Sequence, residues 1–222
     1  MWGIIGAMEQ EIELIVGKMQ DVTVTKHYDG SFYTGTIAGV PVTVAGGGIG
    51  KIRAALAAHI IIQQYGADRI INTGVAGGVS DRLKTCDVVI SEEVIFHDTD
   101  EHYMTEYYPY RYCFQADERL IELAKKAVKD NTGASAVVGR IATGDVFVSD
   151  PEVKSRIVSA VSPLCVEMEG AAIGETAYMN DVPFVVIRSI SDDAGETAQM
   201  KFEEYLEKAA AVSAAIVLEM IG

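Results

Sequence analysis

The sequence predicts a single soluble α/β domain over residues 1–222, and three observations support this. The 222 residues are enough to bury about 70% of the unfolded chain's surface in one core. Strand-like and helix-like segments alternate along the chain, and no repeat, low-complexity tract or linker interrupts them. The run from Pro183 to Asp193 is almost continuously apolar until its polar end, which is typical of a parallel strand that helices cover on both faces.

Charge and composition narrow the class of ligand. The net charge is −14, from 18 basic and 32 acidic residues, which argues against binding to nucleic-acid phosphates or to an anionic membrane. No apolar run approaches the roughly 18 residues that a membrane-spanning helix needs. The first residues lack the basic start of a signal peptide, so we expect a cytoplasmic location. A small neutral or cationic ligand fits this composition best.

The first elements are expected to be a strand and a helix. Trp2 to Ala7 is a short apolar strand, and Met8 to Met19 has apolar residues at helical spacing. Glu9, Glu11 and Glu13 lie in the first turns of this helix, where carboxylates suit the positive end of the helix dipole.

A three-stranded meander is expected next. Its strands are Val22 to His27, Phe32 to Ile37 and Val40 to Ala45, with turns at Asp29-Gly30 and Gly39. Gly46 to Gly50 then leads into an alanine-rich helix that ends near Gln64. These glycines match neither a P-loop nor G-x-G-x-x-G, so no nucleotide cofactor is expected.

The second half continues the alternation. Strands are predicted at Arg69 to Thr73, Val88 to Phe96, Ala136 to Thr143 and Leu164 to Met168, and Gly74 to Gly78 is predicted as a glycine-rich turn. Helices are predicted after Asp117, after Asp150-Pro151, from Gly170 to Met179, and in a closing segment that includes Phe202 to Ile216.

The segment from His97 to Phe114 holds five of the ten tyrosines and has no clear periodicity. We expect a long loop, which is either a lid, binding or interface element or aromatic packing over the core. His97, Asp98, Asp100 and His102 suggest metal ligands, but no ordered scaffold supports them, and no metal is expected. Three scattered cysteines, Cys86, Cys113 and Cys165, are expected to be reduced thiols.

Three acids stand near the ends of predicted strands. Glu11, Glu169 and Asp192 converge on one edge if the sheet is parallel there. Separated carboxyl groups around a sugar are what the cleavage of a glycosidic bond requires, and Phe147 and Met168 could enclose a flat ring. The simpler alternative is that Asp192 or Asp193 only caps a turn.

Six motifs spread over nearly the whole chain carry a resemblance to a known family. They are Gly6-Ala7-Met8-Glu9-Gln10-Glu11, Gly48-Ile49-Gly50-Lys51, Asn72-Thr73-Gly74 with Ala76-Gly77-Gly78, Gly144-Asp145-Val146-Phe147, Val166-Glu167-Met168-Glu169 and Ile190-Ser191-Asp192. Together they resemble the bacterial 5'-methylthioadenosine/S-adenosylhomocysteine nucleosidases. The resemblance implies the nucleoside phosphorylase fold, a three-layer α/β/α sandwich with a mixed central sheet, and a homodimer.

The resemblance also implies a role for each site residue. Asp192 would protonate purine N7, and Glu11 would activate the attacking water, with Arg188 positioning that water or the carboxylate. Glu169 would accept hydrogen bonds from the ribose hydroxyls. The other residues implied in substrate binding are Phe147 and Met168 against the base and sugar, the Val148 backbone at the adenine edge, Ser191 orienting Asp192, and Met8, Ile49, Phe202, Ala7 and Gly74 around the pocket.

Two departures from the family pattern bear on specificity. Val75 stands where a serine is often found, and Glu101 to Tyr112 replaces the segment that helps to wall the 5'-substituent pocket in relatives. The implied reaction releases adenine from methylthioadenosine and S-adenosylhomocysteine, in methionine salvage and methyl-cycle recycling. The alternatives are a purine nucleoside phosphorylase or an aminofutalosine-type nucleosidase of the same fold, and a non-catalytic nucleoside-binding sensor. Phosphorolysis is disfavoured because the first helix presents acids where a phosphate site needs cations.

Overall fold

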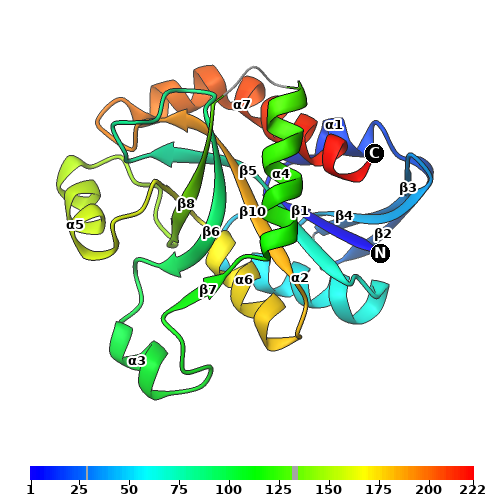
Figure 1. Ribbon diagram of the computed structural model, residues 1–222, viewed down its shortest axis with the longest axis horizontal. Coiled ribbons are helices and arrows are strands. Elements are labelled where there is room, and N and C mark those ends of the chain that lie inside the picture. The colour runs from blue at the N-terminus through cyan, green and yellow to red at the C-terminus, as the bar shows by residue number, and fades with distance from the viewer. Residues whose placement is uncertain (29, 132–134) are drawn as a thin grey trace.

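The computed structural model describes residues 1–28, 30–131 and 135–222, and within them ten strands pair into one mixed sheet (Figure 1). Four neighbouring strands run parallel in the order β4, β1, β5, β10. Their bounds are Val40–Gly46 for β4, Trp2–Gly6 for β1, Arg69–Gly78 for β5 and Phe184–Asp192 for β10. Gly6 pairs with Gly46, so the segments that follow β1 and β4 leave the sheet at the same edge.

The predicted meander is confirmed. β2 (Gln20–His27), β3 (Gly30–Ile37) and β4 pair antiparallel in sequence order. Gly39 has φ +78°, a left-handed conformation that glycine adopts without steric cost, and it makes the turn between β3 and β4. Asp29, where the other turn was predicted, lies outside the described residues.

The other strands close part of the sheet into a ring. β10 pairs with both β5 and β6, so the order β10, β6, β8, β9, β5 returns to β10. The bounds are Val88–Phe96 for β6, Cys113–Gln115 for β7, Ala136–Thr143 for β8 and Cys165–Glu167 for β9. β9 is antiparallel to β5, with Gly77 opposite Val166. The condition on which Glu11, Glu169 and Asp192 were expected to converge, a sheet that is parallel throughout this region, is therefore not met at β9.

The glycine-rich segment 74–78 is the end of β5, and its prediction as a turn is wrong. A Cβ atom on Gly74 would lie 2.3 Å from both Arg188 Nη1 and Glu11 Oε1, and one on Gly77 would lie 2.9 Å from Asp192 Oδ1. These glycines therefore allow charged side chains to lie close to an extended backbone. They do not turn the chain.

Helices cover both sides of the sheet, which confirms the α/β/α arrangement that the resemblance implied. In Figure 1, α1 and α7 lie along the top of the view, and α2 and α6 lie below the sheet. The bounds are Glu9–Val16 for α1, Lys51–Tyr65 for α2, Glu118–Asn131 for α4, Pro151–Val161 for α5, Gly170–Met179 for α6 and Ala198–Ile221 for α7. Asp117 caps α4 as predicted, and Asp150 caps α5, which begins at the predicted place; each accepts hydrogen bonds from first-turn amides. None of the described helices is long and apolar enough to cross a membrane.

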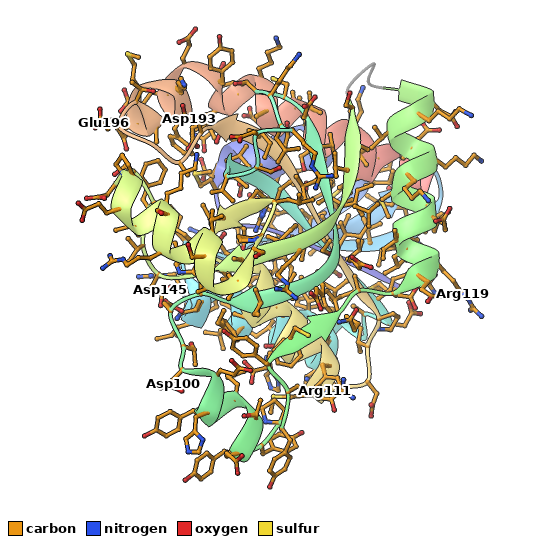
Figure 2. All side chains as sticks on the ribbon, turned by 60° about the vertical axis from the view of Figure 1, so that its left-hand side comes forward. Asp100, Arg111, Arg119, Asp145, Asp193 and Glu196 are labelled. Atoms are coloured by element: carbon orange, nitrogen blue, oxygen red, sulfur yellow. The ribbon has the colours of Figure 1, made fainter. Side chains whose placement is uncertain are left out.

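The aromatic segment is only partly a loop. It contains α3 (Glu101–Glu106), whose first turn is capped by the Asp100 carboxylate at 2.8 Å from the His102 amide. Figure 2 shows α3 extending away from the body of the protein, with Asp100 at its start. Tyr103, Tyr107, Tyr108 and Tyr110 are 59–65% exposed, so these four do not form aromatic packing over the core.

Candidate active site

A cavity of about 110 Å³ lies where the ends of β1, β5 and β10 meet the start of α6. It is lined by Ala7, Met8, Glu11, Ile49, Val75, Ala76, Gly77, Phe147, Val166, Glu167, Met168, Glu169, Ser191, Asp192 and Phe202. Most of the predicted site residues are therefore together. Gly74 and Arg188 lie behind Glu11, and Val148 lines a smaller adjoining cavity with Phe147 and Asp192.

Glu11 is fixed at the first turn of α1 by three backbone donors. Its Oε2 accepts hydrogen bonds from Ala7 N at 2.7 Å and Met8 N at 2.9 Å, and its Oε1 accepts one from Val75 N at 3.0 Å. Burial raises the pKa of Glu11 above its ordinary value, although the Arg188 charge and these three bonds act in the opposite direction. Glu9 and Glu13 are exposed on the same helix, which explains why Glu11 alone belongs to the site.

Asp192 owes its position to a β-bulge. The pairing of β10 with β5 shifts between Ile190 and Asp192, so the strand is not regular and simple alternation does not relate Arg188 to Asp192. Asp192 Oδ2 accepts a hydrogen bond from Ser191 Oγ at 2.7 Å, and Oδ1 accepts one from Ala194 N at 2.8 Å. Burial raises the pKa of Asp192 against the lowering effect of these bonds, and a raised pKa suits a group that donates a proton.

The next residue, Asp193, points away from the cavity. It lies at the surface in the loop that also carries Glu196 (Figure 2), and it pairs with Lys201 Nζ at 2.6 Å. The Lys201 hydrogen bond lowers the pKa of Asp193. Of these two adjacent aspartates, Asp192 is therefore buried at the cavity and Asp193 is exposed to solvent. Asp192 does cap a turn, because it accepts a hydrogen bond from the Ala194 amide, but it also lines the cavity.

Arg188 is completely buried behind the cavity among carboxylates. Its Nη2 donates to Asn72 Oδ1 at 2.7 Å, to Glu167 Oε2, and to Glu169 Oε2 at 3.4 Å. Burial opposes the charged guanidinium, but the surrounding glutamates outweigh it and raise the Arg188 pKa above its already high ordinary value. Arg188 is therefore a permanent cation at the base of the site.

Glu169 connects this cluster to the glycine-rich turn before α2. Its Oε1 accepts a hydrogen bond from Gly50 N at 2.9 Å, while its Oε2 faces Arg188. Burial, and then the negative charge of Glu167, raise the pKa of Glu169 to about 8. The Glu169 carboxyl group therefore keeps its proton to a higher pH than an exposed glutamate does.

Aromatic and apolar side chains form the remaining walls of the cavity. Phe147 is 38% exposed and packs edge-to-face on Phe202, with ring centroids 5.6 Å apart. Val75 packs with Met8 and Phe202 against α7, so this wall has no hydroxyl group. Such a lining suits a flat heterocycle with a small number of polar groups to orient it.

An ion-pair network joins two of the loops that carry these walls. Lys51 Nζ lies 2.7 Å from Asp98 Oδ2 and 3.6 Å from Asp145 Oδ2, and the Lys51 amide donates to Asp145 Oδ1 at 2.9 Å. Lys51 follows the turn that carries Ile49, and Asp145 precedes Phe147. The network therefore connects the two segments that bring Ile49 and Phe147 to the cavity.

Replacing Lys51 with Met is expected to raise the KM for a nucleoside substrate up to about fivefold and to leave kcat nearly unchanged, because a partly exposed ion pair contributes about 1 kcal/mol or less. Steady-state kinetics checks this. Lys125→Met is the matched control, since it removes an exposed pair with Glu122 on α4. An unchanged KM in the Lys51 variant would show that the network does not position the cavity.

Three buried residues of the site were not predicted from the sequence. Glu167 binds Arg188, Thr143 Oγ1 donates to Glu167 Oε1, and Asn72 binds both Arg188 and the Ile5 carbonyl. Glu167 had one signal: it lies within the predicted strand Leu164 to Met168, directly before the predicted site residues Met168 and Glu169.

The two aspartates after β6 bind groups of the protein. Asp98 binds Lys51 and Asp100 caps α3. Across the described ranges, no group of three or more His, Cys, Asp or Glu side chains is arranged to hold a metal ion.

Residues 2–222 match the family model described as "Phosphorylase superfamily". A 5'-methylthioadenosine/S-adenosylhomocysteine nucleosidase from Geobacillus thermodenitrificans is 40% identical, over 98% of this chain and 94% of its own length.

This chain is also similar to solved structures along nearly its whole length. The 5'-methylthioadenosine/S-adenosylhomocysteine nucleosidase from Neisseria meningitidis, in complex with methylthio-immucillin-A, has a TM-score of 0.95 and 41% identity, over 99% of this chain and 97% of that chain. A futalosine hydrolase from Helicobacter pylori has a TM-score of 0.92, covering 99% and 96% of the two chains.

Proposed function

We propose, because this chain belongs to the 5'-methylthioadenosine/S-adenosylhomocysteine nucleosidase family within the phosphorylase superfamily, that the cavity bounded by Glu11, Glu169 and Asp192 is where it hydrolyses the bond between adenine and ribose. The observation that carries this proposal is the arrangement of three buried carboxyl groups from separate elements around one cavity with aromatic walls. Each carboxyl group has a different set of partners and can therefore have a different role.

Asp192 is the general acid in this proposal. It donates a proton to N7 of adenine, the glycosidic bond breaks, and the bonding electrons leave with the base. The support is its raised pKa and the fixed position of its carboxyl group between Ser191 and Ala194.

Glu11 acts on the water in this proposal. Its carboxylate accepts a proton as the water oxygen attacks the anomeric carbon. Arg188 Nη1 and Glu11 Oε1 both lie next to Gly74, so the cation is close to this carboxylate. Glu169 binds the ribose hydroxyls, and an ionised Glu169 also stabilises the positive charge that develops on the sugar. Phe147 and Met168 enclose the base and sugar, and the Val148 backbone reads the adenine edge.

The cavity supports attack by water in preference to phosphate. Among the residues that line it there is no lysine or arginine, and the nearest cation, Arg188, is already bound to Glu167 and Glu169. A phosphate dianion placed there would meet carboxylates without a cation to neutralise it.

The homodimer and the role in methionine salvage belong to the same proposal. Ile52 is 81% exposed on α2 and Met179 is 49% exposed on α6, an apolar surface that a second subunit would cover. The exposed tyrosines in and after α3, Tyr103, Tyr107, Tyr108 and Tyr110, do not line this chain's own cavity, which is consistent with their walling the 5'-substituent pocket of the other subunit.

Adenine release from a panel of nucleosides tests the function. We expect turnover of methylthioadenosine and S-adenosylhomocysteine at the same rate with and without phosphate. A requirement for phosphate would show a phosphorylase, preference for aminofutalosine would place the chain with the futalosine hydrolase neighbour, and no turnover would favour a nucleoside sensor.

A further inference from the structure

Glu167 is the most heavily hydrogen-bonded carboxylate of the site, and the reaction described above assigns it no role. Its Oε1 accepts a hydrogen bond from Thr143 Oγ1. Its Oε2 accepts from Arg188 Nη2, from Glu169 N at 3.0 Å and from Gly170 N at 2.7 Å. All four partners are donors, so the arrangement fits an ionised carboxylate, and the side chain is only 2% exposed.

Glu167 also connects the sheet to α6. Thr143 donates its hydroxyl proton to Glu167, so its oxygen is left to accept from Ala171 N, which lies 2.8 Å away in the first turn of α6. Glu167 itself binds the Gly170 amide at the start of the same helix. The carboxylate is therefore held rigidly between β8, β9 and α6.

The two edges of the Arg188 guanidinium differ in their hydrogen bonds, because Glu167 binds only Nη2. Nη2 is occupied by Asn72, Glu167 and Glu169, whereas Nη1 and Nε have no hydrogen-bond partner among the described residues. Nη1 and Glu11 Oε1 each lie 2.3 Å from the point where a Cβ on Gly74 would be. The free edge of the cation therefore faces the carboxylate that acts on water.

We propose that Glu167 is a positioning residue for the hydrolysis, which holds Arg188 by Nη2 so that Nη1 remains directed at Glu11 and the attacking water. The inference rests on the proposed function of this cavity. Glu167 acts through Arg188 and through its own charge, because its carboxylate oxygens are already bound to four donors of the protein.

A second effect follows from the charge of Glu167. The charged or titratable groups that face this cluster are Arg188 from β10, Glu11 from α1, Glu169 before α6, His97 after β6 and Cys165 within β9. Glu167 contacts Arg188 more closely than Glu169 does, and its negative charge helps to raise the pKa of Glu169 to about 8. Without that charge, Glu169 loses its proton at lower pH.

The test is Glu167→Gln, measured by kcat and by the pH dependence of kcat/KM for methylthioadenosine. Because misplacement of a positioning group by about 1 Å costs up to roughly 100-fold in rate, we expect kcat to fall about 10- to 100-fold. Because the proposed function uses the ionised form of Glu169, and Glu167→Gln removes a charge that raises the Glu169 pKa, the acidic limb of the profile should also move to lower pH. Glu93→Gln is the matched control, because it removes another glutamate–arginine pair, with Arg140 at 2.6 Å, outside the cavity.

Glu167→Asp keeps the charge but withdraws the carboxylate by one methylene group. We expect the wild-type pH limbs with a reduced kcat, and this variant decides the matter if Glu167→Gln does not fold. Wild-type kcat in folded Glu167→Asp, or a loss in Glu167→Gln without any movement of the acidic limb, would overturn the proposal. If Glu11→Gln and Asp192→Asn also retained activity, the proposed function itself would fail, and not only this inference.

Discussion

Asp192→Asn is expected to lower the rate of adenine release from methylthioadenosine by roughly 10² to 10⁴-fold, the usual contribution of a general acid. Asparagine fills the same space but cannot give a proton to N7. Adenine would then have to leave as a poorly stabilised anion. The measurement is single-turnover adenine release at saturating enzyme.

The fold is expected to tolerate this change. Burial raises the pKa of Asp192 because it disfavours the charged carboxylate. The free energy of unfolding is therefore highest at low pH, where Asp192 is protonated, and decreases as pH rises through the raised pKa. The neutral amide removes that cost, so the variant should melt at the same or a higher temperature at alkaline pH. Asp193→Asn is the matched control: its carboxylate is exposed and paired with Lys201, and its loss should leave kcat close to wild type.

Glu11→Gln is expected to give the second largest loss, also about 10² to 10⁴-fold in kcat, because an amide cannot take a proton from water. Binding of adenine should change little, since Glu11 acts on the side of the sugar from which water attacks. Equilibrium titration with adenine and steady-state kinetics separate the two effects. A large loss of adenine affinity with unchanged kcat would contradict this role.

Glu11→Gln also has a cost in stability that must be measured alongside. Both carboxylate oxygens accept backbone N–H groups, and a glutamine NH₂ would face one of those donors, at a cost of about 1–3 kcal/mol in the free energy of unfolding. Glu13→Gln, an exposed change on the same helix, is the control that should affect neither stability nor kcat.

Glu11 and Asp192 are expected to set opposite limbs of the pH dependence of activity. Glu11 must be ionised, so activity falls as pH decreases through its raised pKa, and Asp192 must be protonated, so activity falls as pH increases through its own raised pKa. Asp192→Asn should therefore remove the basic limb from the residual activity, and Glu11→Gln should remove the Glu11 contribution to the acidic limb.

Much of the fold was predictable because its signals are local. β6 (Val88–Phe96) and α6 (Gly170–Met179) have the predicted bounds, since continuous β-branched runs and small-residue helices are recognisable in short windows. The end of β5 was not predictable in this way. Its glycines favour a turn locally, and they form a strand because Glu11, Arg188 and Asp192 occupy the space that Cβ atoms would need.

The site was predictable in its residue types but less so in its geometry. Glu11, Glu169 and Asp192 were found as acids near strand ends, but the antiparallel course of β9 and the bulge before Asp192 depend on pairing with β5, which is remote in sequence. α3 was missed because six residues are too few to show a helical period. Glu167 was missed as a site residue because its importance comes from Arg188, twenty-one residues later.

The most direct test of Asp192 as the acid uses a leaving group that needs no proton. A 5'-methylthioribosyl substrate with a nitrophenolate leaving group departs as a stable anion, so Asp192→Asn should retain activity on it within about tenfold of wild type while losing roughly 10² to 10⁴-fold on methylthioadenosine. Equal losses on the two substrates would show that Asp192 serves the fold or substrate binding and does not donate the proton.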